Sequence, residues 1–477
     1  MSDPSNSEPD SYALRPEDVQ EPPTRLLDAL RQVGPGLILA ASIVGTGELI
    51  NTTGMGAQQG YTLLWLIVLS CVIKVFVQIE LGRYAISHGK TTLAALDTLP
   101  GPRLGTSWLS WLWLFMMLTT QAQIAAMEGL VGQAADMAFP GFMPRLGRLV
   151  ANVSPAFGGY LADHPDYFWA SLTCFAAILL LISGGYRRLE RVTTLLVAMV
   201  TLLTVACVAC LPWTPYPIDM HKLLKGFSFE TPTSGIALAF STFGITGVGA
   251  SELFAYPYWC IEKGYARYAG ARSADDSWAR RARGWMWVMQ VDAWFSTIVF
   301  TTATIAFYIM GAAVLHPQGL HPEGVGMIKT LAQMYVKPIG AWTKIVFLIG
   351  AWAVLFKTLY VATAGNARLT ADFLDLAKIR KQPTTVERER EIRRWLILYP
   401  LLSLALYFLF REPKRLIIAG GYAQAIMIPL IAGATLYLRY RDRDPRVEPS
   451  KLTDVLAWVA FVIITLVAGF SLISAFR

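Results

Sequence analysis

Charged residues are scarce in this sequence. Only 16% of the 477 residues are charged, 54% are apolar, and the mean hydropathy is +0.44. About a quarter of the residues of soluble proteins are charged, so the composition excludes an ordinary soluble domain. Apolar runs long enough to cross about 30 Å of hydrocarbon as helices recur eleven times along the chain. The sequence therefore predicts an all-α polytopic membrane protein with 11 transmembrane helices.

Cysteine and histidine are also few, and their positions exclude two kinds of site. The 5 cysteines are odd in number and all fall in apolar runs, which is not the pattern of a disulfide framework. The 5 histidines lie in loops or near the ends of runs, so no imidazole is expected in mid-membrane to bind a transition metal or relay protons. The sequence also offers no nucleophile–base pair and no metal motif. We therefore expect no enzyme activity and no cofactor.

Basic residues are unevenly distributed over the predicted loops. Lys and Arg concentrate in the loops after the even-numbered spans, and this excess marks the cytoplasmic side. The N-terminus, with a disordered tail over residues 1–33, is then cytoplasmic, and the C-terminus lies outside. The net charge of +8 is a topology signal, because charges spread over short loops without an aromatic platform do not indicate nucleic-acid binding. We expect a multi-pass protein of the plasma (inner) membrane, in contact with lipid.

Two glycine-containing breaks interrupt apolar spans at corresponding places. Residues 45–49 read Gly-Thr-Gly-Glu-Leu in the first span, and residues 247–253 read Gly-Val-Gly-Ala-Ser-Glu-Leu in the sixth. Spans one and six are equivalent if residues 34–212 and 234–438 are two five-helix repeats, followed by an eleventh helix at 453–477. An odd number of helices per repeat inverts the second copy in the membrane. Paired breaks of this kind indicate a transporter site.

The chemistry of the two breaks predicts a cation site. Unwinding a helix frees backbone carbonyls that lipid cannot satisfy, so they must line a cavity and meet a substrate, an ion or water. Carboxylates at the same depth are costly unless they are paired, and Glu48 and Glu252 give the two breaks a formal charge of −2. Both glutamates are therefore expected to bind a small cation. The other candidate ligands are the carbonyls near Gly45 and Ala250 and the hydroxyls of Thr46 and Ser251.

Several segments resemble the Nramp family of divalent-metal transporters. Residues 34–65, GPGLILAASIVGTGELINTTGMGAQQGYTLLW, are similar to the family's first span and the start of its second. Residues 184–192, GGYRRLERV, resemble its entry to span five, and residues 393–400, RRWLILYP, resemble its span nine. The resemblance covers roughly residues 34–440. It implies the LeuT-type fold, an inverted 5+5 repeat with the substrate held between broken helices 1 and 6, in a protein expected to be a monomer.

The metal-binding motifs of that family are changed in this chain. The family's Asp-Pro-Gly-Asn corresponds to residues 45–48, where the Asp is lost and Glu48 replaces the Asn. Its span-six Met and His correspond to Leu253 and Ala255, and Glu252 is added just before them. A thioether favours softer metals, whereas carboxylate, carbonyl and water ligands suit Mg, Ca and Mn. The expected substrate is therefore a hard divalent cation, Mg²⁺ or Mn²⁺, moved by alternating access.

Lys357 in span eight provides an alternative. If its ammonium faces the site, the local charge falls to −1, which suits an organic amine or a zwitterion better than a divalent ion. Tyr256 would then be one of several aromatic faces for a cation–π contact. Lys357 could equally serve only to neutralise a glutamate. A further alternative is a receptor that kept the fold and lost transport, since fold does not fix function.

Four residues are candidates for coupling transport to protons. Acids inside a membrane are functional candidates by default, and Glu128 in span three and Asp292 in span seven are such acids. The family resemblance adds Arg393 and Arg394 on span nine as possible partners. The sequence allows both proton-coupled and passive transport.

Overall fold

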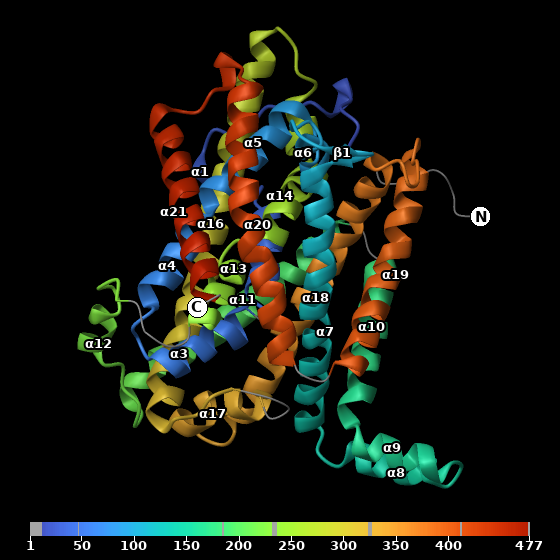
Figure 1. Cartoon of the computed structure of the whole chain (residues 1–477), viewed down its shortest axis with the longest axis vertical. Coiled ribbons are helices and arrows are strands. Elements are labelled where there is room, and N and C mark those ends of the chain that lie inside the picture. The colour runs from blue at the N-terminus through green and yellow to red at the C-terminus, as the bar shows by residue number, and fades with distance from the viewer. Residues whose placement is uncertain are drawn as a thin grey trace.

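The computed structural model describes residues 12–45, 47–183, 186–230, 236–322, 327–410 and 413–475. Almost all of these residues lie in helices, and the only strands among them, β1 (Arg103–Leu104) and β2 (Thr106–Ser107), form a short antiparallel pair. The prediction of an all-α polytopic protein is confirmed. The helices form one bundle, with short helices at both ends (Figure 1).

The described residues contain nine helices long and apolar enough to cross a membrane, or ten if one bent pair counts as a span. The bent pair consists of Pro35–Ile43 and Gly47–Gln59, and the helix axis bends by 43° between them. The remaining predicted span, residues 234–262, is divided between α13 (Ile236–Ile245) and α14 (Ala250–Lys263). Spans one and six are thus the two broken helices that the sequence predicts.

The elements have the following bounds. The spans contain α2 (Pro35–Ile43), η3 (Gly47–Thr52), α3 (Thr53–Gln59), α4 (Leu64–Ile73), α5 (Val75–His88), α7 (Trp108–Ala138), α10 (Pro165–Ser183), α11 (Tyr186–Cys210), α13, α14, α16 (Asp276–Met310), η5 (Gly311–Leu315), α18 (Thr343–Leu376), α19 (Thr385–Leu409), α20 (Pro413–Arg441) and α21 (Lys451–Ala475). The connections contain η2 (Pro16–Asp18), α1 (Leu26–Leu30), α6 (Thr92–Leu96), α8 (Phe142–Ala151), α9 (Pro155–Asp163), η4 (Leu211–Trp213), α12 (Met220–Lys225), α15 (Tyr265–Ala269), η6 (His316–Gln318), α17 (Met327–Ile339) and η8 (Pro445–Val447).

Two sets of packed helices surround the broken ones. Helix α7 packs against α10, α18, α19 and α20, whereas α2 packs against α11, α14, α16 and α18. Figure 1 shows α7 running along the bundle, with α8 and α9 beyond its lower end and α6 and β1 at its upper end. Helix α18 belongs to both sets and also packs against α14, so it joins the two sets beside the broken helices.

Residues 12–33 differ from the disordered tail expected over residues 1–33. The Tyr12 hydroxyl donates to Glu262 at 2.8 Å, the Trp285 indole N–H donates to the Gln20 carbonyl at 3.0 Å, and Ala29 is fully buried. These contacts fasten the segment to the ends of α14 and α16. Composition alone marks the segment as polar and does not reveal the few anchors that bind it.

Candidate functional site

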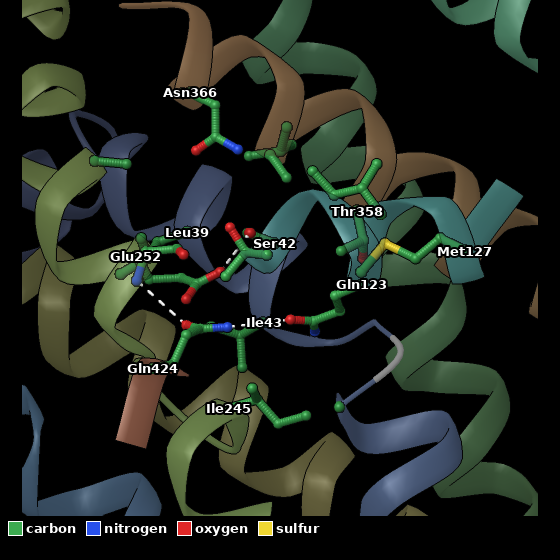
Figure 2. Close-up of a pocket in the computed structure, with 18 of the residues that line it drawn as sticks. Leu39, Ser42, Ile43, Gln123, Met127, Ile245, Glu252, Thr358, Asn366 and Gln424 are labelled. Carbon is green, nitrogen blue, oxygen red and sulfur yellow. Dashed lines mark hydrogen bonds between the residues drawn. The ribbon is translucent and has the colours of Figure 1, made fainter. Parts of the chain in front are cut away.

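A small cavity of about 50 Å³ lies between the two broken helices (Figure 2). Its walls come from α2, α13 and α14 together with α7, α18 and α20. The polar residues that line it are Ser42, Thr120, Gln123, Ser251, Glu252, Thr358, Asn366 and Gln424. The cavity therefore combines one carboxylate with neutral amide and hydroxyl groups.

Glycine is required at both breaks because other parts of the protein approach closely. A Cβ atom at Gly45 would lie 2.3 Å from the Thr358 hydroxyl oxygen. At Gly247 the backbone has a φ of +66°, and a Cβ atom would lie 2.7 Å from the Cα atom of Cys71. This left-handed conformation is costly for other residues. The first glycine of each Gly-x-Gly pattern thus has a steric cause, whereas a Cβ atom at Gly47 would lie no closer than 3.4 Å to its nearest neighbour.

Glu252 is the acidic residue of the cavity wall. Its Oε1 atom accepts a hydrogen bond from the Ser42 hydroxyl at 2.7 Å (Figure 2). Beside it, the Gln424 side chain accepts from the Ser251 backbone N–H at 3.2 Å and donates to Gln123 Oε1, also at 3.2 Å. This network joins α2, α7, α14 and α20 around the cavity, which fixes the direction of the carboxylate and of both amides.

Glu48 is fully buried beside the first break and does not line the cavity. Its carboxylate accepts from the Gly45 backbone N–H at 3.1 Å and from the Thr304 hydroxyl at 3.4 Å. Ser42, which donates to Glu252, and Gly45, which donates to Glu48, lie only three residues apart at the end of α2. The structure thus brings the two predicted carboxylates into one region, but only Glu252 reaches the cavity.

The other predicted site residues are divided between the cavity and its surroundings. Ser251 lines the cavity, whereas Gly45 and Ala250 do not, and Thr46 lies outside the described residues. Tyr256 is fully buried away from the cavity, and its hydroxyl donates to Asp292 at 3.2 Å. Tyr256 therefore offers no aromatic face to a substrate in this conformation.

Lys357 does not face the cavity, contrary to what the amine alternative requires of it. Its ammonium donates to the Ala41 carbonyl at 2.7 Å and to the Val44 carbonyl. The next residue, Thr358, lines the cavity instead. The ammonium thus occupies the carbonyl end of α2, where a cation ligand set was expected.

Asp292 holds the N-terminus of α2. Its two carboxylate oxygens accept from the Gly34 backbone N–H at 2.8 Å and from the Gly36 backbone N–H at 2.7 Å. A carboxylate at this position satisfies otherwise unpaired N–H groups and complements the positive end of the helix dipole. This geometry indicates a structural role for Asp292 in fixing the first broken helix.

Replacing Asp292 by Ala is therefore expected to destabilise the protein by about 2–5 kcal/mol, since two buried N–H groups lose their acceptor. Thermal unfolding of the purified protein would measure this effect. Asp276→Ala is the control, because Asp276 is an exposed residue at the start of α16, the helix that also contains Asp292. This variant should unfold close to the wild-type temperature. An Asp292→Ala variant of wild-type stability would remove the structural role.

The remaining coupling candidates lie in two different environments. Glu128 is fully buried in α7, and neither carboxylate oxygen has a hydrogen-bond partner among the described residues. Ile124 and Met127, on the same helix, line the cavity. By contrast, Arg393 and Arg394 are exposed, and Arg394 pairs with Glu391 at 2.9 Å. The structure thus places Glu128, but neither arginine, beside the cavity wall.

Several cavity residues do not stand out in the sequence. Gln123, Asn366 and Gln424 are amides within apolar spans, and that position is the one signal that could have identified them. Met127 brings a thioether to the wall from α7, although the span-six methionine of the family is absent (Figure 2). The described residues contain no group of three or more His, Cys, Asp or Glu side chains arranged for a metal ion. A cation held here would depend on one carboxylate, neutral oxygens and retained water.

Comparison with known proteins places this geometry in a family. Residues 36–474 match the Nramp family, described as natural resistance-associated macrophage protein-like. No curated protein matches the chain. Among solved structures, a manganese transporter from Eremococcus coleocola has a TM-score of 0.63 at 16% identity, and the alignment covers 95% of this chain and 88% of that one.

Two other solved structures share the fold, with similarly low sequence identity to this chain. MhsT in complex with L-phenylalanine has a TM-score of 0.55 at 16% identity, with 96% of this chain and 99% of that chain covered. Mhp1, a nucleobase-cation-symport-1 family transporter, has a TM-score of 0.56 at 12% identity, with 96% of each chain covered. These likenesses confirm the LeuT-type fold. The chain is a multi-pass membrane protein that belongs to the Nramp family.

Proposed function

We propose that this protein transports a hard divalent cation, Mg²⁺ or Mn²⁺, by alternating access, and that the ion binds in the cavity beside Glu252. The observation that supports this most directly is the position of the half-buried Glu252 carboxylate, which accepts a hydrogen bond from Ser42 in the wall of a small cavity where oxygen-bearing side chains lie among apolar ones. A carboxylate within a membrane span is costly, and such residues usually belong to the path of a substrate or an ion.

The size and the ligands of the cavity suit a partly hydrated ion. One water molecule needs roughly 10–15 Å³ of such volume, so about 50 Å³ holds an ion with a few waters. Mg²⁺ usually keeps several waters and binds one or two carboxylates directly. The amides of Gln123 and Gln424 and the Ser251 hydroxyl could accept hydrogen bonds from those waters or donate elsewhere in the network.

The transport assay is uptake of Mg²⁺ or Mn²⁺ into proteoliposomes that contain an ion-sensitive dye. We expect saturable uptake that empty liposomes lack. Absence of uptake of every divalent ion by folded protein would contradict the proposal. In the proposed orientation the N-terminus is cytoplasmic, the C-terminus is outside, and the protein is a monomer in the plasma (inner) membrane.

We propose that Glu128 carries the proton in a proton-coupled cycle. Its carboxylate lacks a hydrogen-bond partner among the described residues and lies on the helix that supplies Ile124 and Met127 to the cavity. With a pH-sensitive dye inside the liposomes, wild-type protein should acidify the lumen during ion uptake. Glu128→Gln, which is nearly isosteric, should keep uptake but lose most of the acidification. Unchanged acidification in this variant would exclude Glu128 as the carrier.

One observation favours a second candidate, an organic zwitterion or amine. The formal charges of Glu48, Glu252, Lys74 and Lys357 sum to zero, which suits a neutral zwitterion, and Trp259 adds an aromatic wall to the cavity. Against this, about 50 Å³ is far below the roughly 300 Å³ of the smallest typical organic-ligand pockets. Uptake assays with both classes of substrate decide between the two candidates. Uptake of an amine or amino acid without uptake of divalent ions would establish the second candidate.

A further inference from the structure

At each break, the carbonyls that end the first half of the broken helix accept hydrogen bonds from a buried lysine of another span. Lys357 of α18 donates to the carbonyls of Ala41 and Val44, at the end of α2. Lys74, at the junction of α4 and α5, donates to the Thr246 carbonyl at 2.7 Å and to the Phe243 carbonyl, at the end of α13. Both lysine side chains are fully buried.

The two arrangements have the same pattern of acceptors and helpers. In each break the two acceptor carbonyls are three residues apart, at positions 41 and 44 and at positions 243 and 246. In each, a hydroxyl from the lysine's own span shares a carbonyl: Thr358 donates to the Ala41 carbonyl at 3.3 Å, and Ser70 donates to the Thr246 carbonyl at 3.0 Å. The pattern therefore occurs once at each of the two breaks.

Carbonyls at the end of a broken helix form a cation site. They lack helical partners and carry the negative end of the helix dipole, equivalent to about −0.5 of an elementary charge. In transporters with broken helices, such carbonyls coordinate the coupling ion. A lysine ammonium is a compact cation with three donors, so it can occupy such a position permanently.

The contacts of the lysines distinguish this role from simple neutralisation of the glutamates. Within the described part of the chain, neither Lys74 nor Lys357 forms a salt bridge within 4 Å, and the hydrogen bonds that their ammonium groups donate go to backbone carbonyls. The ammonium groups are thus held directly by the helix ends, and the charges of Glu48 and Glu252 act on them only over a longer distance.

We propose that Lys74 and Lys357 are tethered cations that fill the monovalent-cation position at the two helix breaks, so that the protein cycles without binding a coupling alkali-metal ion. The two lysines act as positioning residues, because they hold the half-helices that carry the cavity. The proposal does not depend on which substrate the cavity takes.

Removing the side chain should therefore open a site that a small free cation can fill. The test uses purified full-length protein in choline chloride, sodium chloride, potassium chloride and methylammonium chloride, with thermal unfolding as the readout. Wild-type protein should unfold at the same temperature in all four salts. Lys357→Ala and Lys74→Ala should unfold at lower temperature in choline and regain at least about 2 °C in sodium or methylammonium, because ligand binding to the folded state raises its stability.

Two further variants make the test specific. Lys357→Met and Lys74→Met fill the space without a charge, so they should be destabilised and show no recovery in any salt. Lys451→Ala, an exposed lysine at the start of α21, should behave as wild type. If an alanine variant does not fold in choline, the yield of monodisperse protein purified in sodium against choline replaces the unfolding temperature, with the same expected order.

Two results would overturn the proposal. One is an alanine variant that is as stable as wild type in choline. The other is an alanine variant that is destabilised equally in all four salts and cannot be distinguished from its methionine counterpart. Because neither result involves substrate uptake, failure here is separate from failure of the metal-transport proposal.

Discussion

Replacing Glu252 by Gln is expected to lower divalent-cation uptake at least about 100-fold. Among the described residues, Glu252 is the only charged side chain in the cavity wall, and the variant removes its charge while keeping its size and the hydrogen bond from Ser42. Neutral oxygens alone would have to replace the hydration shell of a strongly hydrated ion, and Mg²⁺ gives up its water reluctantly. Uptake into proteoliposomes at several ion concentrations measures the effect. Glu448→Gln, in the exposed loop before α21, is the matched control and should transport as wild type.

Glu48→Gln is expected to slow ion uptake without abolishing ion binding. Its carboxylate accepts from the Gly45 N–H and the Thr304 hydroxyl, and it does not line the cavity. We therefore expect this variant to slow uptake through the geometry of the first break while it still binds the ion, whereas Glu252→Gln should lose binding itself. Full transport by both glutamine variants would show that the two breaks are not the site.

Gly311→Val is expected to destabilise the protein by about 3 kcal/mol or more. A Cβ atom at Gly311 would lie 2.2 Å from the Thr53 carbonyl oxygen, and on the facing segment a Cβ atom at Gly56 would lie 2.4 Å from the Tyr308 carbonyl oxygen. Backbone meets backbone here, so no flexible side chain can move aside, and overpacking of this kind forces the helices apart. The contact joins α3, which follows the first break, to η5 at the end of span seven.

Thermal unfolding and the fraction of monodisperse protein after solubilisation measure this loss. Gly159→Val in α9 is the control, because a Cβ atom there would have no neighbour within 4 Å. Gly311→Val should unfold well below both wild type and the control. Equal stability of the two valine variants would contradict the close approach of α3 and η5.

Local features of the sequence are sufficient to predict the spans and their breaks. Hydropathy over about 20 residues identifies helices that cross a membrane, and glycine marks positions where another chain segment comes too close for a Cβ atom, as at Gly45 and Gly247. Glu48 and Glu252 come shortly after the glycines of the two breaks in the sequence. The hydropathy, the glycines and the glutamates can all be identified from residues close together in the sequence, although the contacts that require the glycines come from distant segments.

The cavity wall depends on contacts between distant segments, and the sequence does not reveal it. Gln123 and Gln424 lie 301 positions apart and meet only because α7 packs against α20. The direction of Lys357 is likewise set by the place where α2 ends. A lysine beside a predicted cation site could face a substrate, a glutamate or a carbonyl, and only the fold selects the third.

Calorimetric titration of the purified protein with Mg²⁺ and Mn²⁺ tests the central claim most directly. The wild-type protein should bind one ion per chain, and Glu252→Gln should show no binding while it remains folded. If the wild-type protein binds neither ion, the cavity beside Glu252 is not a divalent-cation site, and amines and amino acids become the substrates to test.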